Sequence, residues 1–80
     1  MDISIRNAEQ AEMPFLITCI ERVRQHQNVE SAVIHVAKRG ARRGSPQWVE
    51  YLIIITYETG STMTVGAIQR TLDADIEFHS

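Results

Sequence analysis

Hydrophobic residues recur at three- and four-residue spacing in one part of the chain. The apolar positions there are Met13, Leu16, Cys19, Ile20 and Val23. This spacing is typical of an amphipathic helix that buries one face. Pro14 lies in the expected first turn, where proline is tolerated because its missing N–H would have no partner within the helix. The pattern therefore predicts one helix that begins near Met13.

Elsewhere the pattern changes to the two-residue alternation of strands. It indicates a short strand around Ile3 and Ile5, and then strands at about 29–38, 48–58 and 61–70 and around Ile76 and Phe78. Thr59-Gly60 predicts a hairpin turn, because glycine adopts positive φ without strain. We expect a single α+β domain over residues 1–80. One amphipathic helix packs on one face of a mainly antiparallel four- to five-stranded sheet, in the order β-α-β-β-β-β.

The expected central strand is apolar on both sides. Tyr51, Ile53 and Ile55 alternate with Leu52 and Ile54, so they point to opposite faces. One helix covers only one face, and an uncovered apolar patch usually marks an interface. We therefore expect a homodimer, or a complex with another protein. The predicted partner-binding residues on the uncovered face are Val33, Trp48, Leu52, Ile54 and Ile68.

A basic segment separates the first two long strands. Lys38, Arg39, Arg42 and Arg43 are four of the eight Lys and Arg residues in a chain of net charge -2. These cations predict an alternative function, a nucleic-acid-binding module that contacts phosphates. The acidic average opposes broad binding to phosphate backbones. The same arginines also fit an acidic protein partner, because guanidinium groups make bidentate contacts with carboxylates.

The sequence contains no motif for catalysis, metal binding or cofactor binding. Its three histidines are scattered, and the single Cys19 lies within the helical apolar stripe, where thiols are usually inert. His35 and Glu50 are an acid–base candidate only if a pocket joins them. We expect no metal, no cofactor and no small-molecule substrate. The chain is predicted to be a small non-enzymatic protein that acts by binding or regulation.

The first part of the chain carries one family resemblance. Residues 1–8 followed by 13–16 are similar to the opening strand and helix of acyl-CoA-dependent N-acetyltransferases. In that family an Arg/Gln-x-x-Gly-x-Gly/Ala loop, which opens a helix, holds the cofactor pyrophosphate. The glycine-containing segment from Arg39 to Gly44 does not match that loop and lies between strands. The resemblance therefore covers a strand-to-helix start and implies no cofactor site.

Composition and length limit the remaining possibilities. The chain is 44% hydrophobic and 22% charged, as in ordinary folded proteins. A lone cysteine cannot form an internal disulfide, and we find no leader-like segment and no apolar run of about 18 residues. We therefore expect a cytoplasmic protein without membrane contact. A domain of this size buries only about 60% of its unfolded surface, so its stability is marginal.

Overall fold

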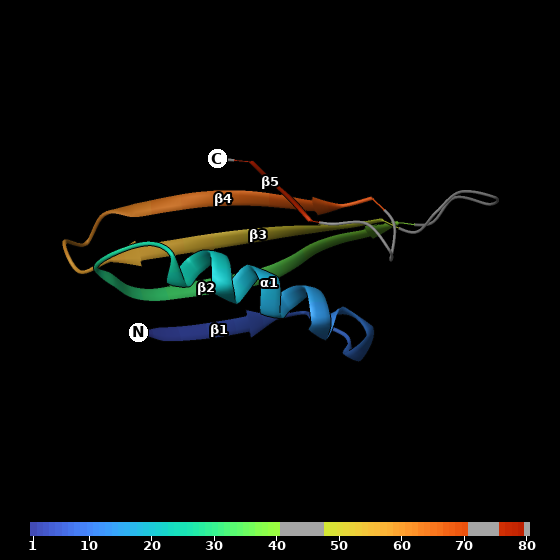
Figure 1. Ribbon diagram of the computed structural model, residues 1–80, viewed down its shortest axis with the longest axis horizontal. Helices are drawn as coiled ribbons and strands as arrows, with labels where there is room; N and C mark the ends of the chain where they lie inside the picture. Colours follow the sequence, from blue (N-terminus) through green and yellow to red (C-terminus); the bar gives the residue numbers. More distant parts are fainter. Residues whose placement is uncertain (41–47, 71–75, 80) are drawn as a thin grey trace.

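The computed structural model describes residues 1–40, 48–70 and 76–79. These residues form one α-helix and five strands (Figure 1), which confirms the α+β prediction. The elements are β1 (Asp2–Arg6), the 3-10 turn η1 (Gln10–Glu12), α1 (Met13–Arg24), β2 (Val29–Gly40), β3 (Trp48–Tyr57), β4 (Thr62–Gln69) and β5 (Glu77–His79). The sequence also predicts a turn at Leu72-Asp73, before the last strand, and these two residues lie outside the described part of the chain.

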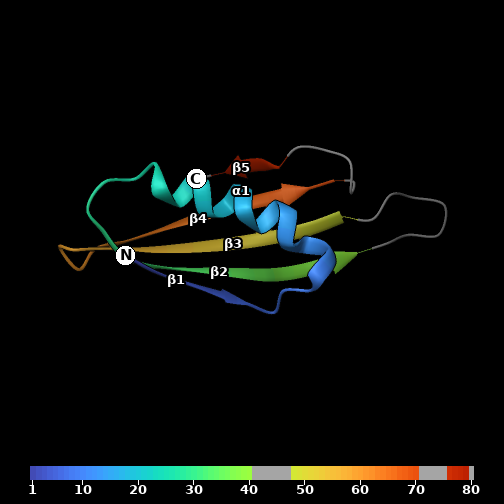
Figure 2. The ribbon, with the colours of Figure 1, turned by 60° about the horizontal axis from the view of Figure 1, so that its bottom comes forward.

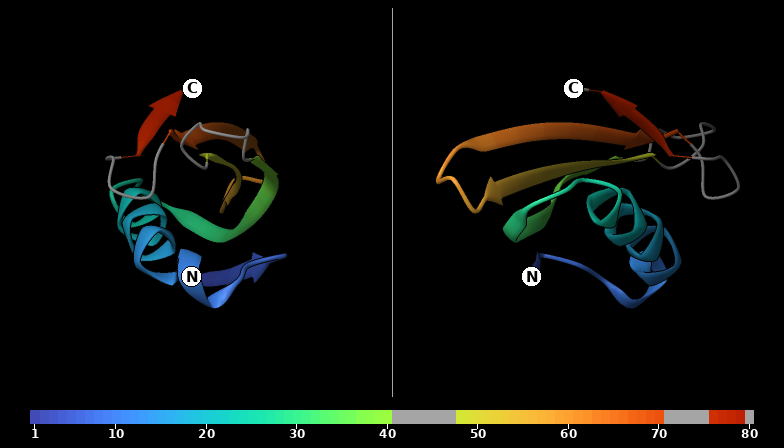
Figure 3. Two further views of the ribbon diagram at one scale, coloured as in Figure 1. Left: turned by 90° about the vertical axis from the view of Figure 1, so that its right-hand side faces the viewer. Right: turned by 60° about the vertical axis from the view of Figure 1, so that its left-hand side comes forward.

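The strands form one sheet in the order β1-β2-β3-β4-β5. The predicted antiparallel meander runs from β2 to β5, whereas β1 pairs with β2 in parallel. Parallel neighbours need a crossover connection, and α1 supplies it. Figures 2 and 3 show α1 across one face of the sheet, here called the inner face. We call the opposite face, which no described element covers, the outer face.

Residues in the left-handed region mark three of the chain reversals. Asn7, with φ 62°, ends β1, and its side-chain Nδ2 donates to the carbonyl of Val36 at 2.9 Å. Asn28, with φ 60°, precedes β2. Gly60 has φ 89°, and its N–H donates to the carbonyl of Tyr57 at 2.8 Å. The predicted hairpin at Thr59-Gly60 is confirmed, and glycine suits this position because it has no Cβ to clash.

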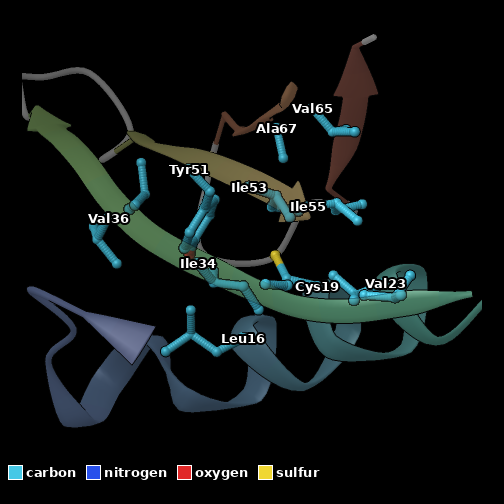
Figure 4. Packing of buried hydrophobic residues seen from close by; sticks show 13 residues of the cluster. Leu16, Cys19, Val23, Ile34, Val36, Tyr51, Ile53, Ile55, Val65 and Ala67 are labelled. Atoms are coloured by element: carbon cyan, nitrogen blue, oxygen red, sulfur yellow. The ribbon is translucent and has the colours of Figure 1, made fainter. Parts of the chain in front are cut away.

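The core lies between α1 and the inner face of the sheet (Figure 4). Its largest buried hydrophobic members are Leu16, Cys19 and Val23 from α1, Ile34 and Val36 from β2, and Val49, Tyr51, Ile53 and Ile55 from β3. The alternation of β3 is therefore confirmed. Within the described chain no helix, including the 12-residue α1, is long and apolar enough to cross a membrane.

The position of Met13 on the helix differs from the prediction. Its side chain is 44% exposed, and the preceding residue, Glu12, is buried instead. Successive helical residues turn by about 100°, so Met13 points toward the flank of α1 when Glu12 points toward the sheet. The buried stripe consists of Glu12, Leu16, Cys19 and Val23.

Candidate functional site

The outer face carries the five residues predicted to bind a partner. Val33 lies directly opposite Ile54, Leu52 lies opposite both His35 and Gly66, and Trp48 is opposite Gly40. Ile68 of β4 faces Glu50 of β3. Because side chains directly opposite in an antiparallel pair share a face, β2, β3 and β4 place all five residues on the same side. We call the set Val33, Trp48, Leu52, Ile54 and Ile68 the outer-face patch.

The outer-face patch has an apolar centre and polar surroundings. Ile54 is 37% exposed, and the other four members are half-buried. Thr64 lies opposite Ile54, and the neighbouring outer-face positions include His35, Glu50 and Thr56. This mixture resembles the polar rim and apolar centre of non-obligate interfaces rather than a continuous core.

Trp48 is held at one end of the outer-face patch by Gly40. A Cβ atom at Gly40 would overlap the indole ring of Trp48, so any larger residue there would displace the ring. Close approach of this kind requires glycine. Because Gly40 has no side chain, the indole of Trp48 can lie directly over the end of β2 on the outer face.

A shallow hollow of about 340 Å³ adjoins Leu52 on the outer face. Small residues, Ala37 and Gly66, leave room for it, and Glu50 and His79 are among its lining residues. His35, the predicted acid–base partner of Glu50, is not part of this lining. The hollow extends the outer-face patch.

The basic segment is divided between the two faces of the sheet. Arg42 and Arg43 lie outside the described residues, whereas Lys38 and Arg39 belong to β2. β2 contains a bulge in which Ala37 has no partner, between Val36 opposite Tyr51 and Lys38 opposite Glu50. The extra residue reverses the alternation that follows it. Lys38 is therefore exposed, and Arg39 turns to the inner face opposite Val49.

Arg39 forms a bidentate ion pair with Glu12. Its Nε donates to Glu12 Oε2 at 2.5 Å, and its Nη2 donates to Glu12 Oε1 at 2.7 Å and also to the carbonyl of Asn7. The side chain of Glu12 is 5% exposed and that of Arg39 is 24% exposed. The backbone N–H of Glu9 also donates to Glu12 Oε1 at 2.7 Å. This pair joins the start of α1 to the end of β2.

The charge on each partner is stabilised by the other. The hydrogen bond from Arg39 holds the pKa of the Glu12 carboxyl below its usual value, against the opposing effect of burial. The same hydrogen bond raises the pKa of the Arg39 guanidinium. A charge-assisted, bidentate contact of this geometry is the strong form of an ion pair. Arg39 thus already has an intramolecular carboxylate partner, whereas the exposed Lys38 forms no ion pair with any residue that the structure describes.

Sequence reasoning missed Glu12, although a signal was present. Glu12 precedes Leu16 by four residues and therefore falls on the apolar stripe of α1. A buried carboxylate at such a position needs a cation within reach. Arg39 could not be predicted as the partner of Glu12, because simple alternation without the bulge at Ala37 places Arg39 on the outer face.

Four other residues with reactive or titratable side chains, Cys19, His26, Tyr51 and Tyr57, are buried or half-buried. Burial raises the pKa of the Cys19 thiol to about 11 and that of Tyr51 to about 12. The Tyr51 hydroxyl donates to Gln69 Oε1 at 3.3 Å, and the Tyr57 hydroxyl lies 3.1 Å from His26 Nδ1. Among the described residues no three His, Cys, Asp or Glu side chains gather closely enough to hold a metal ion.

No protein-family model matches the sequence, and no curated protein or solved structure matches it. The likeness to N-acetyltransferases therefore stays confined to a strand followed by a helix.

Proposed function

We propose that this chain is a protein-binding module whose partner surface is the outer face of the sheet. One observation carries the proposal: Ile54, at the centre of the sheet, is 37% exposed and lies directly opposite Val33 on a face that no described element covers. Burying apolar surface of this kind stabilises a complex by roughly 25 cal/mol per Å² before the costs of association. No bound cofactor or catalytic group enters into this function.

A second copy of the chain is the partner that we propose. Two copies can stack their outer faces as the two sheets of a sandwich do, with sheets about 10 Å apart. The polar residues around the outer-face patch, such as Thr64 and Glu50, then lie at the rim, where water remains accessible. Another protein that presents a complementary apolar surface is the alternative occupant.

Trp48 provides a direct measurement, because it is the chain's single tryptophan and belongs to the outer-face patch. Stacking of the outer faces should shift its fluorescence to shorter wavelength as protein concentration rises. Ile54→Asp places an uncompensated charge in the contact, which costs several kcal/mol, and should abolish the shift. Thr18→Asp adds the same charge on the exposed side of α1 and should leave the shift unchanged. Emission that stays constant up to high micromolar wild-type protein contradicts self-association through this face.

Nucleic-acid binding through the basic segment remains the alternative proposal, and it rests on Lys38, which is exposed at the end of β2. Its test substitutes Lys38, Arg42 and Arg43 with Ala and keeps Arg39, so that the ion pair to Glu12 is preserved. If the alternative holds, wild-type protein binds short DNA or RNA, and binding weakens as salt rises. The triple variant should lower the slope of log K against log salt by roughly 0.7 to 0.9 for each lost phosphate contact. Absence of binding at low salt eliminates the alternative.

A further inference from the structure

Among the described residues, β1 forms one edge of the sheet and has a neighbouring strand on one side only. β1 pairs with β2 along its whole length, from Asp2 opposite Ser31 to Arg6 opposite His35, and no other described strand adjoins it. Edge strands are usually blunted by proline, bulges, very short length or charged side chains, and the charged residues of β1 are Asp2 and Arg6. β1 contains no proline and its register is unbroken. The other edge, β5, is three residues long, and its Glu77 is paired with Arg70 at 3.4 Å.

The sequence of β1 is complementary to itself when two copies run antiparallel. With Ser4 opposite Ser4 of the second copy, Asp2 faces Arg6 twice and Ile3 faces Ile5 twice. Both ionic contacts then lie on the outer side of the strand, and both apolar contacts lie on the inner side. Neither Asp2 nor Arg6 takes part in an ion pair within the described part of the chain.

Other registers lose this complementarity. A shift of one residue places isoleucines opposite polar residues and turns the second copy over, because side chains alternate along a strand. A shift of two residues keeps the faces aligned but pairs only three residues and leaves the charges unmatched. The register centred on Ser4 is the one that uses all five residues of β1 and pairs every charge.

An exposed apolar flank of α1 lies on the same side of the molecule. The guanidinium of Arg22 lies 5.1 Å from the centre of the Phe78 ring, which shows that this flank of α1 faces β5. At 3.6 residues per turn, the opposite flank carries Met13, Ile17 and Ile20 and faces the β1 side. Ile17 is 54% exposed and Met13 is 44% exposed. In the views of Figure 3 the blue first turns of α1 lie beside β1.

We propose that two copies of this chain associate through β1, in an antiparallel pair centred on Ser4 that makes one continuous ten-stranded sheet. The two α1 helices then lie on the same face of the sheet, each with its Met13 and Ile17 flank turned toward the second copy. A five-residue strand pair alone buries less than the roughly 1,200–2,000 Å² of a stable interface, so the helix flanks contribute the remaining contact. This surface shares no residue with the outer-face patch, and the inference does not rest on the proposed function.

The test uses charge reversal in the whole chain. Asp2→Arg places Arg opposite Arg, and Arg6→Asp places Asp opposite Asp, so each variant should weaken self-association about tenfold or more in sedimentation analysis. An equimolar mixture of the two variants restores opposite charges at both contacts and should form a heterodimer. The double variant Asp2→Arg with Arg6→Asp should self-associate as wild type does.

Circular dichroism and thermal melting serve as folding controls, because both side chains are exposed and their substitution should leave the monomer intact. Ile54→Asp alters the outer-face patch and should leave the β1 pairing unchanged. A wild-type chain that stays monomeric at high micromolar concentration overturns the inference. So does a dimer that neither single reversal weakens, or single variants whose mixture shows no recovery.

Discussion

Ile53→Ala is expected to lower the free energy of unfolding by about 2–5 kcal/mol. Ile53 is fully buried at the centre of β3, between Ile34 of β2 and Val65 of β4, and it faces the core under α1 (Figure 4). The truncation removes apolar contacts and leaves a cavity that the surrounding strands fill only in part. Small domains have only about 5–15 kcal/mol of stability in total, so this loss is a large fraction. Leu16→Ala truncates a fully buried side chain of α1 in the same core and is expected to fall in the same range.

Urea unfolding followed by circular dichroism measures this loss, at low micromolar protein so that self-association adds no stability. Ile54→Ala is the matched control, because it makes the same change one residue along the same strand on the outer face. Its cost should stay below about 1 kcal/mol. Equal losses at Ile53 and Ile54 would show that the two faces of β3 are buried alike, contrary to the structure.

Arg39→Ala is expected to lower the Tm at neutral pH by about 5 °C or more. Without the guanidinium, the Glu12 carboxylate stays buried and loses its cation, which is more costly than losing an exposed pair. The carbonyl of Asn7 loses a donor as well. Lys38→Ala removes the adjacent cation, which is exposed, and should change the Tm little. A Lys38→Ala effect as large as that of Arg39→Ala would contradict the division of the basic segment between the two faces.

The effect of Arg39→Ala should depend on pH. In the wild type the pKa of Glu12 is lowered in the folded state from an ordinary value of 4.5, chiefly by the Arg39 hydrogen bond. The stabilisation from the pair is therefore complete above the unfolded-state pKa and is lost as pH falls through the lower folded-state pKa. The Tm difference between wild type and Arg39→Ala should shrink when the pH is lowered from 7 to below 4.5. A difference that stays constant or grows in acid would contradict the assignment of Glu12 as the charged partner.

The elements of this fold could be predicted because their signals are local. The spacing of Leu16, Cys19 and Val23 needs no tertiary information, and neither does the alternation of Ile53 with Ile54. Placement of the apolar residues of β3 on two faces follows from the same alternation. The hairpin at Gly60 could be predicted as well, because the positive φ angle of its turn favours glycine.

The remaining features depend on contacts between distant segments. The bulge at Ala37 brings Arg39 to Glu12, and no pattern within β2 reveals where an extra residue is accommodated. The exposure of Ile17 depends on how α1 is rotated against the sheet, which is set by packing around Leu16 and by the contact of Arg22 with Phe78. The parallel pairing of β1 likewise has no signature in its five residues.

The parallel position of β1 also sets an order of assembly. The connection between β1 and β2 contains the whole of α1, so Asp2 pairs with a residue far along the chain, Ser31. In contrast, β3 and β4 are joined by the short turn at Gly60. Closing the longer connection costs more chain entropy, so we expect the hairpins to form first on local contacts and β1 to dock afterwards, against a sheet that already exists. Local unfolding of the native state should follow the opposite order, because a short edge strand detaches at a lower free energy than the central strands. We therefore expect the backbone amides of β1 to exchange their hydrogens through local opening, and those of β3 to exchange only when the whole domain unfolds.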